Sequence, residues 1–244
     1  MYNRFSDFYD ELVFDIDYEK YANNIFEILN KYNVNKGNIL EIGCGTGNLT
    51  QELSKNKDYN ILAFDNSIEM LNHSFVKLSD KENVTIILQD MYKFDYKSFK
   101  HDAIITLLDV INYITDEAKL EKLFKNIYDG LNENGVFIFD LNSRYKLLEV
   151  LGNNQYIYER KNIFYTWENR LVGDKVNFYL NFFVKNKDGL YERVEEMQVE
   201  KYYSIEFIVE KLKTVGFREI DYIDEDGGVF KENNTQRILF SAKK

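Results

Sequence analysis

Hydrophobic and polar positions follow two alternating patterns along the first 142 residues. Short continuous apolar runs predict buried strands, and longer segments with apolar residues every three or four positions predict amphipathic helices. Strands are expected at 39–42, 60–64, 84–88, 103–108 and 136–141, and helices at about 17–32, directly after each of the first two strands, and at 116–131. Because continuous apolar strands alternate with helices, the pattern predicts an α/β fold with helices on both faces of a parallel sheet.

After residue 142 the pattern changes to strands separated by polar turns. A short helix is expected at 144–151, followed by strands at 158–167, 175–184 and 193–203. Helical spacing returns at 204–215, and two strands at 217–223 and 237–242 enclose an acidic loop. The chain shows no repeat and no Gly/Ser linker. It is therefore expected to form one domain, 1–244, with an antiparallel insertion at about 143–203.

The composition excludes several classes of partner. The 244 residues carry a net charge of −10 and a pI near 4.9, whereas nucleic-acid binding needs a basic patch, so no nucleic-acid partner is expected. The single cysteine, Cys44, excludes an intramolecular disulfide and a cysteine zinc site, and no metal is expected. Neither a membrane span nor a signal peptide is evident, so we expect a cytoplasmic protein without a membrane partner. The sequence does not indicate an oligomeric state.

The segment NILEIGCGTGNLT, residues 38–50, is where a strand turns into a helix. Glycine at Gly43, Gly45 and Gly47 allows positive φ and lets a ligand approach the main chain closely. Glu41 lies in the preceding strand, where burying a charge is unfavourable unless a partner offsets it. The turn therefore predicts a polar ligand that carries a cationic group.

Polar residues also follow the other predicted strands. Asp65, Asp90, Asp109 and Asn142 come at or just after strand ends, and ligands of open α/β sheets bind at the carboxyl ends of the strands. Asp65 lies 22 residues after Gly43, which suits a carboxylate that accepts both hydroxyl donors of a ribose. For any one aspartate alone, a helix cap or turn residue remains the alternative.

Two other nucleotide sites fit the sequence less well. A dinucleotide-binding turn, as in a nicotinamide-dependent reductase, would have a third glycine at position 48, but the chain has Asn48. A Walker-type phosphate loop would need a following Gly-Lys-Ser/Thr, which is absent.

The motifs LEIGCGTGNLT, AFDNSIEML, LQDM and ITLLDVINYI resemble those of class I S-adenosylmethionine-dependent methyltransferases over roughly residues 36–142. More weakly, FSDFYDEL and FDLNSRYK extend the resemblance to small bacterial methyltransferases of undefined substrate, some relatives of which methylate amino groups of molecules such as amino sugars. The resemblance implies a Rossmann-like, seven-stranded sheet, mostly parallel with the last strand antiparallel, and a substrate-covering β insertion after the fifth strand.

It also implies S-adenosylmethionine as the cofactor and roles for particular residues. Gly43 and Gly45 would contact the methionine part, Glu41 would offset its ammonium, and Leu108 and Asp109 would border the end that carries the methyl group. Asp65 would hold the ribose. Asn66, Ser67 and Met70 would line the adenine side. Asp90 would bind the adenine amino group, and Met91 would pack beside the ring. Tyr9 would close over the cofactor as part of a lid at 1–16.

Methyl transfer needs positioning more than an enzyme nucleophile, and the sequence offers few bases. His73 and His101 are predicted to be surface residues, which favours an amine over a poorly acidic hydroxyl as acceptor. A chain without proline also lacks the Asn-Pro-Pro-Tyr signature of base-directed amino methylation. The catalytic candidates are Asp109, Tyr113 and Arg144, and further residues of the acceptor pocket would be Asn142, Tyr145, Tyr165 and Trp167. Alternatively, the aromatic residues of the insertion only pack against its sheet.

The sequence thus predicts a methyltransferase that acts on a small molecule, with N-methylation of an amine favoured. A catalytically silent S-adenosylmethionine-binding sensor or partner protein is the alternative. The acceptor itself is not predicted.

Overall fold

The computed structural model describes residues 5–244, and its larger part is a seven-stranded sheet with strand order β10-β11-β5-β4-β1-β2-β3. The strands are β1 (Gly37–Ile42), β2 (Tyr59–Asp65), β3 (Val84–Leu88), β4 (His101–Thr106), β5 (Leu131–Asn142), β10 (Arg218–Asp224) and β11 (Arg237–Lys243). β11 runs antiparallel to both of its neighbours, β5 and β10. The other pairings are parallel. The predicted fold class is confirmed.

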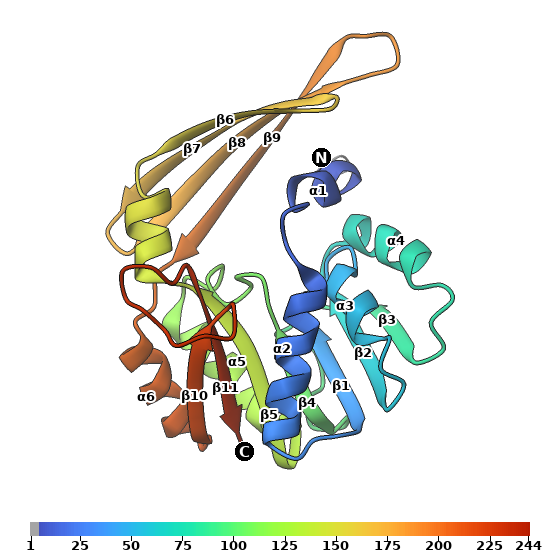
Figure 1. The fold of residues 1–244 in the computed structure, drawn as a ribbon, viewed down its shortest axis with the longest axis vertical. Coiled ribbons are helices and arrows are strands. Elements are labelled where there is room, and N and C mark those ends of the chain that lie inside the picture. Colours follow the sequence, from blue (N-terminus) through green and yellow to red (C-terminus); the bar gives the residue numbers. More distant parts are fainter. Residues whose placement is uncertain (1–4) are drawn as a thin grey trace.

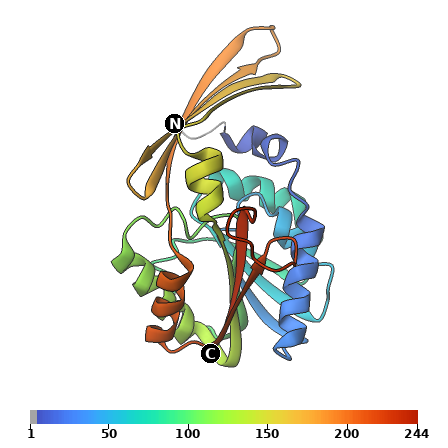
Figure 2. The ribbon, with the colours of Figure 1, turned by 60° about the vertical axis from the view of Figure 1, so that its left-hand side comes forward.

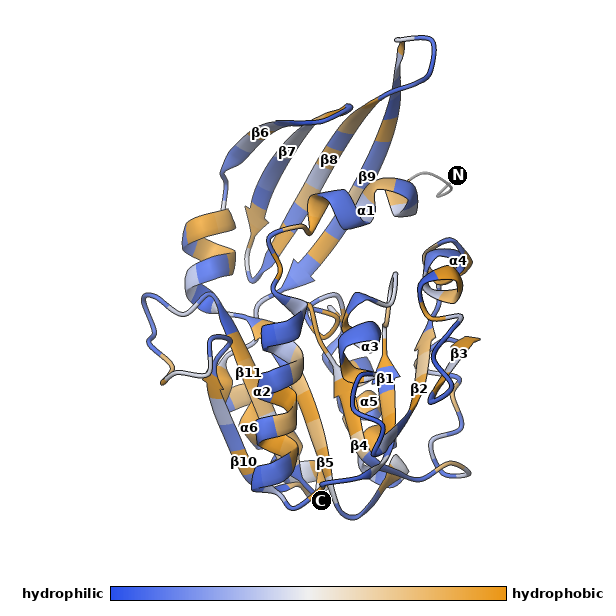
Figure 3. Cartoon of the chain, turned by 45° about the vertical axis from the view of Figure 1, so that its right-hand side comes forward, coloured by the Kyte–Doolittle hydropathy of each residue, from blue (hydrophilic) through white to orange (hydrophobic). Residues whose placement is uncertain are grey.

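Helices cover both faces of this sheet (Figures 1 and 2). They are α2 (Tyr18–Lys31), α3 (Asn48–Leu53), α4 (Ile68–Lys77), α5 (Glu117–Gly130) and α6 (Ile205–Val215). Apolar side chains of α2, α3 and α4 form one buried cluster with the sheet, and those of α5 and α6 form another on the opposite face. Figure 3 shows the corresponding apolar strands between polar outer helix faces. Within residues 5–244, no helix is both long and apolar enough to cross a membrane.

The insertion is a second, four-stranded antiparallel sheet that projects from the strand ends (Figure 1). Its strands are β6 (Gln155–Arg160), β7 (Ile163–Val172), β8 (Lys175–Lys185) and β9 (Tyr191–Lys201), and the π-helix η1 (Tyr145–Leu151) precedes them. The single strand expected at 158–167 is wrong, because the chain reverses at Lys161, where φ is +50°. Tyr158 and Tyr165 pair across the resulting hairpin, so apolar residues flank the turn closely enough to read as one strand.

The N-terminal segment forms an additional helix, α1 (Phe5–Leu12), that the pattern did not predict. It lies between the two sheets (Figures 1 and 3). Phe5 and Phe8 pack against Phe182 of β8, with ring centroids 5.5 and 4.9 Å apart. On its other side, Asp10 accepts hydrogen bonds from the glycine turn and from α4. α1 therefore links the insertion to the carboxyl ends of β1 and β2. Residues 1–4 of the predicted lid lie outside the described residues.

Candidate active site

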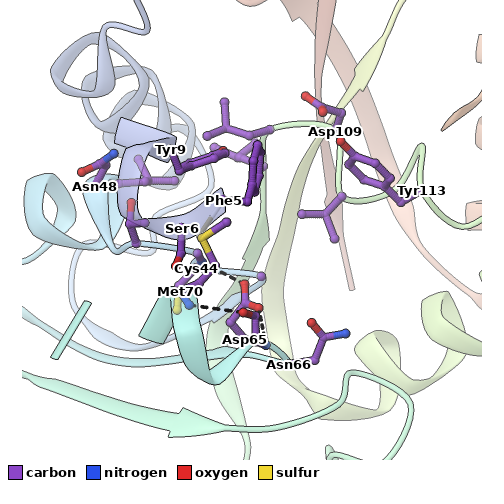
Figure 4. A pocket seen from close by; sticks show the side chains of 18 of the residues that line it. Phe5, Ser6, Tyr9, Cys44, Asn48, Asp65, Asn66, Met70, Asp109 and Tyr113 are labelled. Carbon is purple, nitrogen blue, oxygen red and sulfur yellow. Dashed lines mark hydrogen bonds between the residues drawn. The ribbon is translucent and has the colours of Figure 1, made fainter. Parts of the chain in front are cut away.

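Two adjoining cavities lie at the carboxyl ends of β1, β2, β3 and β4. The first, about 300 Å³, is bounded by the glycine turn, α1, the loop after β4 and strand β9. The second, about 380 Å³, lies beside the residues that follow β3. Five residues line both cavities: Gly43, Asp65, Asn66, Val110 and Tyr113. Figure 4 shows Phe5 and Tyr9 entering the first cavity from α1, with Asp109 and Tyr113 on the side of the β4 loop.

Glycine is required in the turn after β1 for steric reasons. Gly43 has φ +74°, and a Cβ there would lie 2.9 Å from Val110 Cγ2. Gly47, with φ +79°, precedes α3, and a Cβ there would lie 2.4 Å from Ser74 Oγ. The main chain of the turn consequently lies against the loop after β4 on one side and against α4 on the other. Side chains in these positions would push those elements apart.

Asp65 ends β2 with both carboxylate oxygens held by main-chain donors. Its Oδ2 accepts the Gly45 N–H at 2.9 Å, and its Oδ1 accepts the Ser67 N–H at 2.9 Å. Ser67 in turn caps α4 by accepting the Met70 N–H at 3.2 Å. A carboxylate oxygen has more than one lone pair, so Asp65 can also accept donors from a ligand in the cavities.

Glu41 is a buried carboxylate that needs a cation. It is 3% exposed, and its Oε2 has no hydrogen-bond partner within residues 5–244. Burial, together with the charge of Asp65, raises the pKa of Glu41 to about 7. Because an unpartnered buried charge is unfavourable, this atom fits a ligand with an ammonium or sulfonium group. The carboxylates of Glu41 and Asp65 thus suit the cofactor that the sequence predicts.

The loop after β4 forms another wall of the first cavity. Leu108 and Asp109 both have positive φ, +60° and +61°, and the carboxylate of Asp140 accepts their N–H groups at 2.9 and 2.8 Å. Arg237 of β11 is buried and contacts Asp109 at 2.5 Å, Asp140 at 3.0 Å and Glu225 at 3.6 Å. The periodicity of the sequence did not predict this cluster.

α1 forms the roof of the first cavity. Asp10 accepts hydrogen bonds from Thr46 Oγ1 at 2.6 Å, Asn48 Nδ2 at 3.0 Å and Lys77 Nζ at 2.9 Å. Tyr9 and Tyr18 border the same cavity. Burial raises the pKa of both phenols, that of Tyr18 to about 12. Both tyrosines are therefore neutral hydrogen-bonding groups at physiological pH.

The side of the cavity that faces the insertion is formed by Glu196 and Gln198 of β9. The Tyr113 hydroxyl donates to Gln198 Oε1 at 2.9 Å. Two positions further along the same face of β9, Glu200 accepts a hydrogen bond from Asn142 Nδ2 at 2.6 Å, and burial raises the pKa of Glu200. This side of the site is thus rich in carboxylate and amide oxygens.

The structure brings most of the predicted site residues together. The cofactor candidates all line the two cavities: Tyr9, Glu41, Gly43, Gly45, Asp65, Asn66, Ser67, Met70, Leu108 and Asp109 line the first, and Asp90 and Met91 line the second. Among the acceptor candidates, Tyr113 lines both cavities. Arg144 instead pairs with Glu149 at 2.7 Å with half of its side chain exposed. Trp167 packs inside the insertion, and Tyr165 packs in the cluster between the insertion and α1.

Other lining residues were missed because they depend on tertiary contacts. Phe5 and Ser6 reach the cavity only because α1 packs over it. Glu196 and Gln198 reach it only because β9 passes beside it. Alternation along β9 could have grouped these two on one face, but it could not show which face meets the site. Among residues 5–244, no His, Cys, Asp and Glu side chains are grouped to hold a metal ion.

Comparisons with known proteins agree with this geometry. Residues 39–135 match the family described as "Methyltransferase domain". A solved S-adenosylmethionine-dependent methyltransferase from Clostridium acetobutylicum ATCC 824 is 37% identical, with a TM-score of 0.88 over 99% of this chain and 98% of that one. YqeM of Bacillus subtilis (strain 168), a candidate methyltransferase, is 27% identical over 100% of this chain and 97% of its own.

A third relative shares the fold at lower identity. It is CalS10, an amino pentose methyltransferase from Micromonospora echinaspora solved with S-adenosylmethionine bound, with a TM-score of 0.74 and 16% identity over 93% of this chain and 92% of that one. The high identity to the clostridial enzyme over nearly the whole of both chains decides the family. This chain belongs to the class I S-adenosylmethionine-dependent methyltransferases, and S-adenosylmethionine is its cofactor.

Proposed function

We propose that this methyltransferase transfers the methyl group to an amine nitrogen of a small molecule bound beneath the four-stranded sheet. The observation that carries the proposal is the oxygen-rich side of the cavity, formed by Glu196 and Gln198 beside Tyr113. Carboxylate and amide oxygens suit a cationic, donor-rich acceptor such as an ammonium group. The amino pentose methyltransferase with the same fold is consistent with such an acceptor.

The nearby cationic side chains do not favour an anionic acceptor over a cationic one. The guanidinium of Arg237 is paired with Asp109 and Asp140. Burial lowers the pKa of Lys146, which also lies close to the charge of Arg237. An anionic acceptor would find fewer free partners here than a cationic one.

We infer from the lining residues that the cofactor binds in the two cavities. Glu41 would pair with the ammonium of the methionine part beside Gly43 and Gly45, and Leu108 and Asp109 would border the end that carries the methyl group. Asp65 would accept the ribose hydroxyls. The second cavity would hold adenine beside Asn66, Asp90 and Met91, and Ser67 and Met70 would line the adenine side from the adjoining first cavity.

Two segments would complete the site within a single domain, 1–244. The lid, residues 1–16, would cover the cofactor through Tyr9, and the insertion, about 143–203, would cover the acceptor. The described contacts of α1 with both the glycine turn and β8 support this arrangement.

When bound, S-adenosylmethionine supplies an electrophilic methyl group on a sulfonium sulfur. An amine reacts through its lone pair, so an ammonium held by Glu196 must first lose a proton. Burial raises the pKa of Glu196, so its carboxylate accepts that proton at a higher pH than an exposed glutamate would. The roof formed by α1 and the insertion would exclude water and hold the nitrogen in line.

The test combines a set of acceptors with a pair of variants. Transfer of labelled methyl groups should reach small amines, such as amino sugars and polyamines, and not their hydroxyl counterparts. Glu196→Gln should lower kcat/KM for the amine near pH 7 by about 100-fold, because the variant can no longer take up the proton. Glu195→Gln is the matched control, since its side chain points to the opposite, exposed face of β9. Transfer to hydroxyls alone, or full activity of Glu196→Gln, would overturn the proposal.

A further inference from the structure

The loop after β4 contains an unfavourable backbone conformation in contact with the cavity. Leu108 and Asp109 are consecutive residues with φ of +60° and +61°. Residues with a Cβ adopt this left-handed region at a steric penalty, and such conformations persist only where the surroundings hold them. Both residues line the first cavity, so whatever holds this turn also shapes the cavity wall.

Asp140 holds the turn directly. Its two carboxylate oxygens accept the N–H groups of Leu108 and Asp109, at 2.9 and 2.8 Å, from the neighbouring strand β5. Asp140 is 1% exposed, so its charge needs a partner inside the protein. Arg237 provides that partner at 3.0 Å, and the same Nη1 atom contacts Asp109 at 2.5 Å.

The turn also presses against the glycine turn. Val110, the next residue, lies so close to Gly43 that a Cβ on this glycine would be 2.9 Å from Val110 Cγ2. A shift of the β4 loop would therefore change the space between the two turns. In the proposed arrangement, that space holds the methionine end of the cofactor.

We propose that Asp140 and Arg237 are positioning residues for methyl transfer, which hold Leu108 and Asp109 in the left-handed conformation that shapes the methyl-donor end of the site. Neither residue touches the acceptor in this arrangement. The proposal rests on the assignment of the first cavity to the methionine part of the cofactor, and it does not depend on the acceptor being an amine.

A double-mutant cycle tests the proposal, because glycine adopts positive φ without the steric penalty. Asp140→Asn, which retains the shape but not the charge, should weaken S-adenosylhomocysteine binding about tenfold by titration calorimetry. It should also shift the NMR signal of bound S-adenosylmethionine labelled with ¹³C at the methyl group. In a Leu108→Gly background, the same substitution should weaken binding about threefold or less, because one of the two left-handed residues then adopts this conformation without the steric penalty.

Arg237→Lys provides a second route if Asp140→Asn does not fold. It keeps a cation but lacks the second nitrogen, Nε, through which Arg237 also contacts Glu225, and its effect should also shrink in the Leu108→Gly background. Lys243→Gln, at the other end of β11 and paired only with Glu219 among the described residues at 3.3 Å, is the control that should leave binding and the methyl signal unchanged.

Equal losses of affinity in the two backgrounds would overturn the proposal, because they would mean that Asp140 affects cofactor binding independently of the backbone conformation at Leu108. Normal binding with an unshifted methyl signal in Asp140→Asn would also overturn it. Both readouts use the cofactor alone. A failure of the amine proposal would therefore leave this result unaffected, and the reverse also holds.

Discussion

At the scale of single residues, Glu41 shows how burial prepares a side chain for a charged ligand. Its carboxylate is 3% exposed and partly unpartnered among the described residues. With its pKa raised to about 7, it is about half protonated at neutral pH in the free protein. The ionised form is the one that can pair with an ammonium, so cofactor binding should be coupled to loss of this proton.

This coupling gives the affinity a definite pH dependence. From pH 6 to pH 8 the ionised fraction of Glu41 rises from roughly one-tenth to nine-tenths, so the affinity for S-adenosylhomocysteine should rise about tenfold. In Glu41→Gln, which has no proton to lose, affinity should be lower and nearly independent of pH over that range. Titration calorimetry at pH 6, 7 and 8 measures both proteins. Parallel pH dependences would contradict the role of Glu41.

At the scale of elements, α1 is the piece that joins two parts of the site. It contacts the glycine turn and α4 through Asp10, and β8 through Phe5 and Phe8. Its eight residues are too few for a stable isolated helix. Its order therefore depends on these contacts.

Asp10→Asn should release α1 from the cofactor side. The variant loses the charge that strengthens the hydrogen bonds from Thr46 and Lys77, so amide hydrogen exchange in residues 5–12 should accelerate and the Kd for S-adenosylhomocysteine should rise about tenfold. Asp7→Asn is the matched control on the same helix, where the side chain is 62% exposed and meets only His73 at 3.3 Å among the described residues. Exchange rates in α1 that are the same in Asp10→Asn as in the unaltered protein would exclude this coupling.

At the scale of the whole molecule, the two sheets have apolar cores of different size. Phe139 is fully buried in the large sheet, stacked between Phe137 and Phe240 with ring centroids 4.6 and 5.0 Å apart. Phe182 is also fully buried, but in a small cluster with Phe8 and Ile163. The same substitution in the two cores should therefore affect different parts of the molecule.

Phe139→Ala should lower the free energy of unfolding by about 3–5 kcal/mol and shift the main thermal transition. Phe182→Ala should instead make the insertion and α1 more susceptible to limited proteolysis, because local opening follows local contact density. Calorimetry and proteolysis of both variants, with and without cofactor, separate the two effects. A main transition that falls equally in both would mean that the sheets unfold as one unit.

Local sequence patterns determined much of this protein. Hydrophobic patterning predicted each strand of the large sheet and the helices at 17–32, 116–131 and 204–215. The spacing from Gly43 to Asp65 placed both at the same cavity. These predictions succeeded because they depend on neighbouring residues and on the rule that parallel strands end at one edge.

Tertiary structure alone decided how distant segments meet. The pairing of Arg237 with Asp109 and Asp140 depends on β11 lying beside β5, and local periodicity does not specify which strands are neighbours. The fold of α1 over the glycine turn and the face of β9 that meets the site through Glu196 could not be predicted for the same reason. Strand and helix periods report which side of an element is buried, but contacts between elements arise from packing across the whole chain.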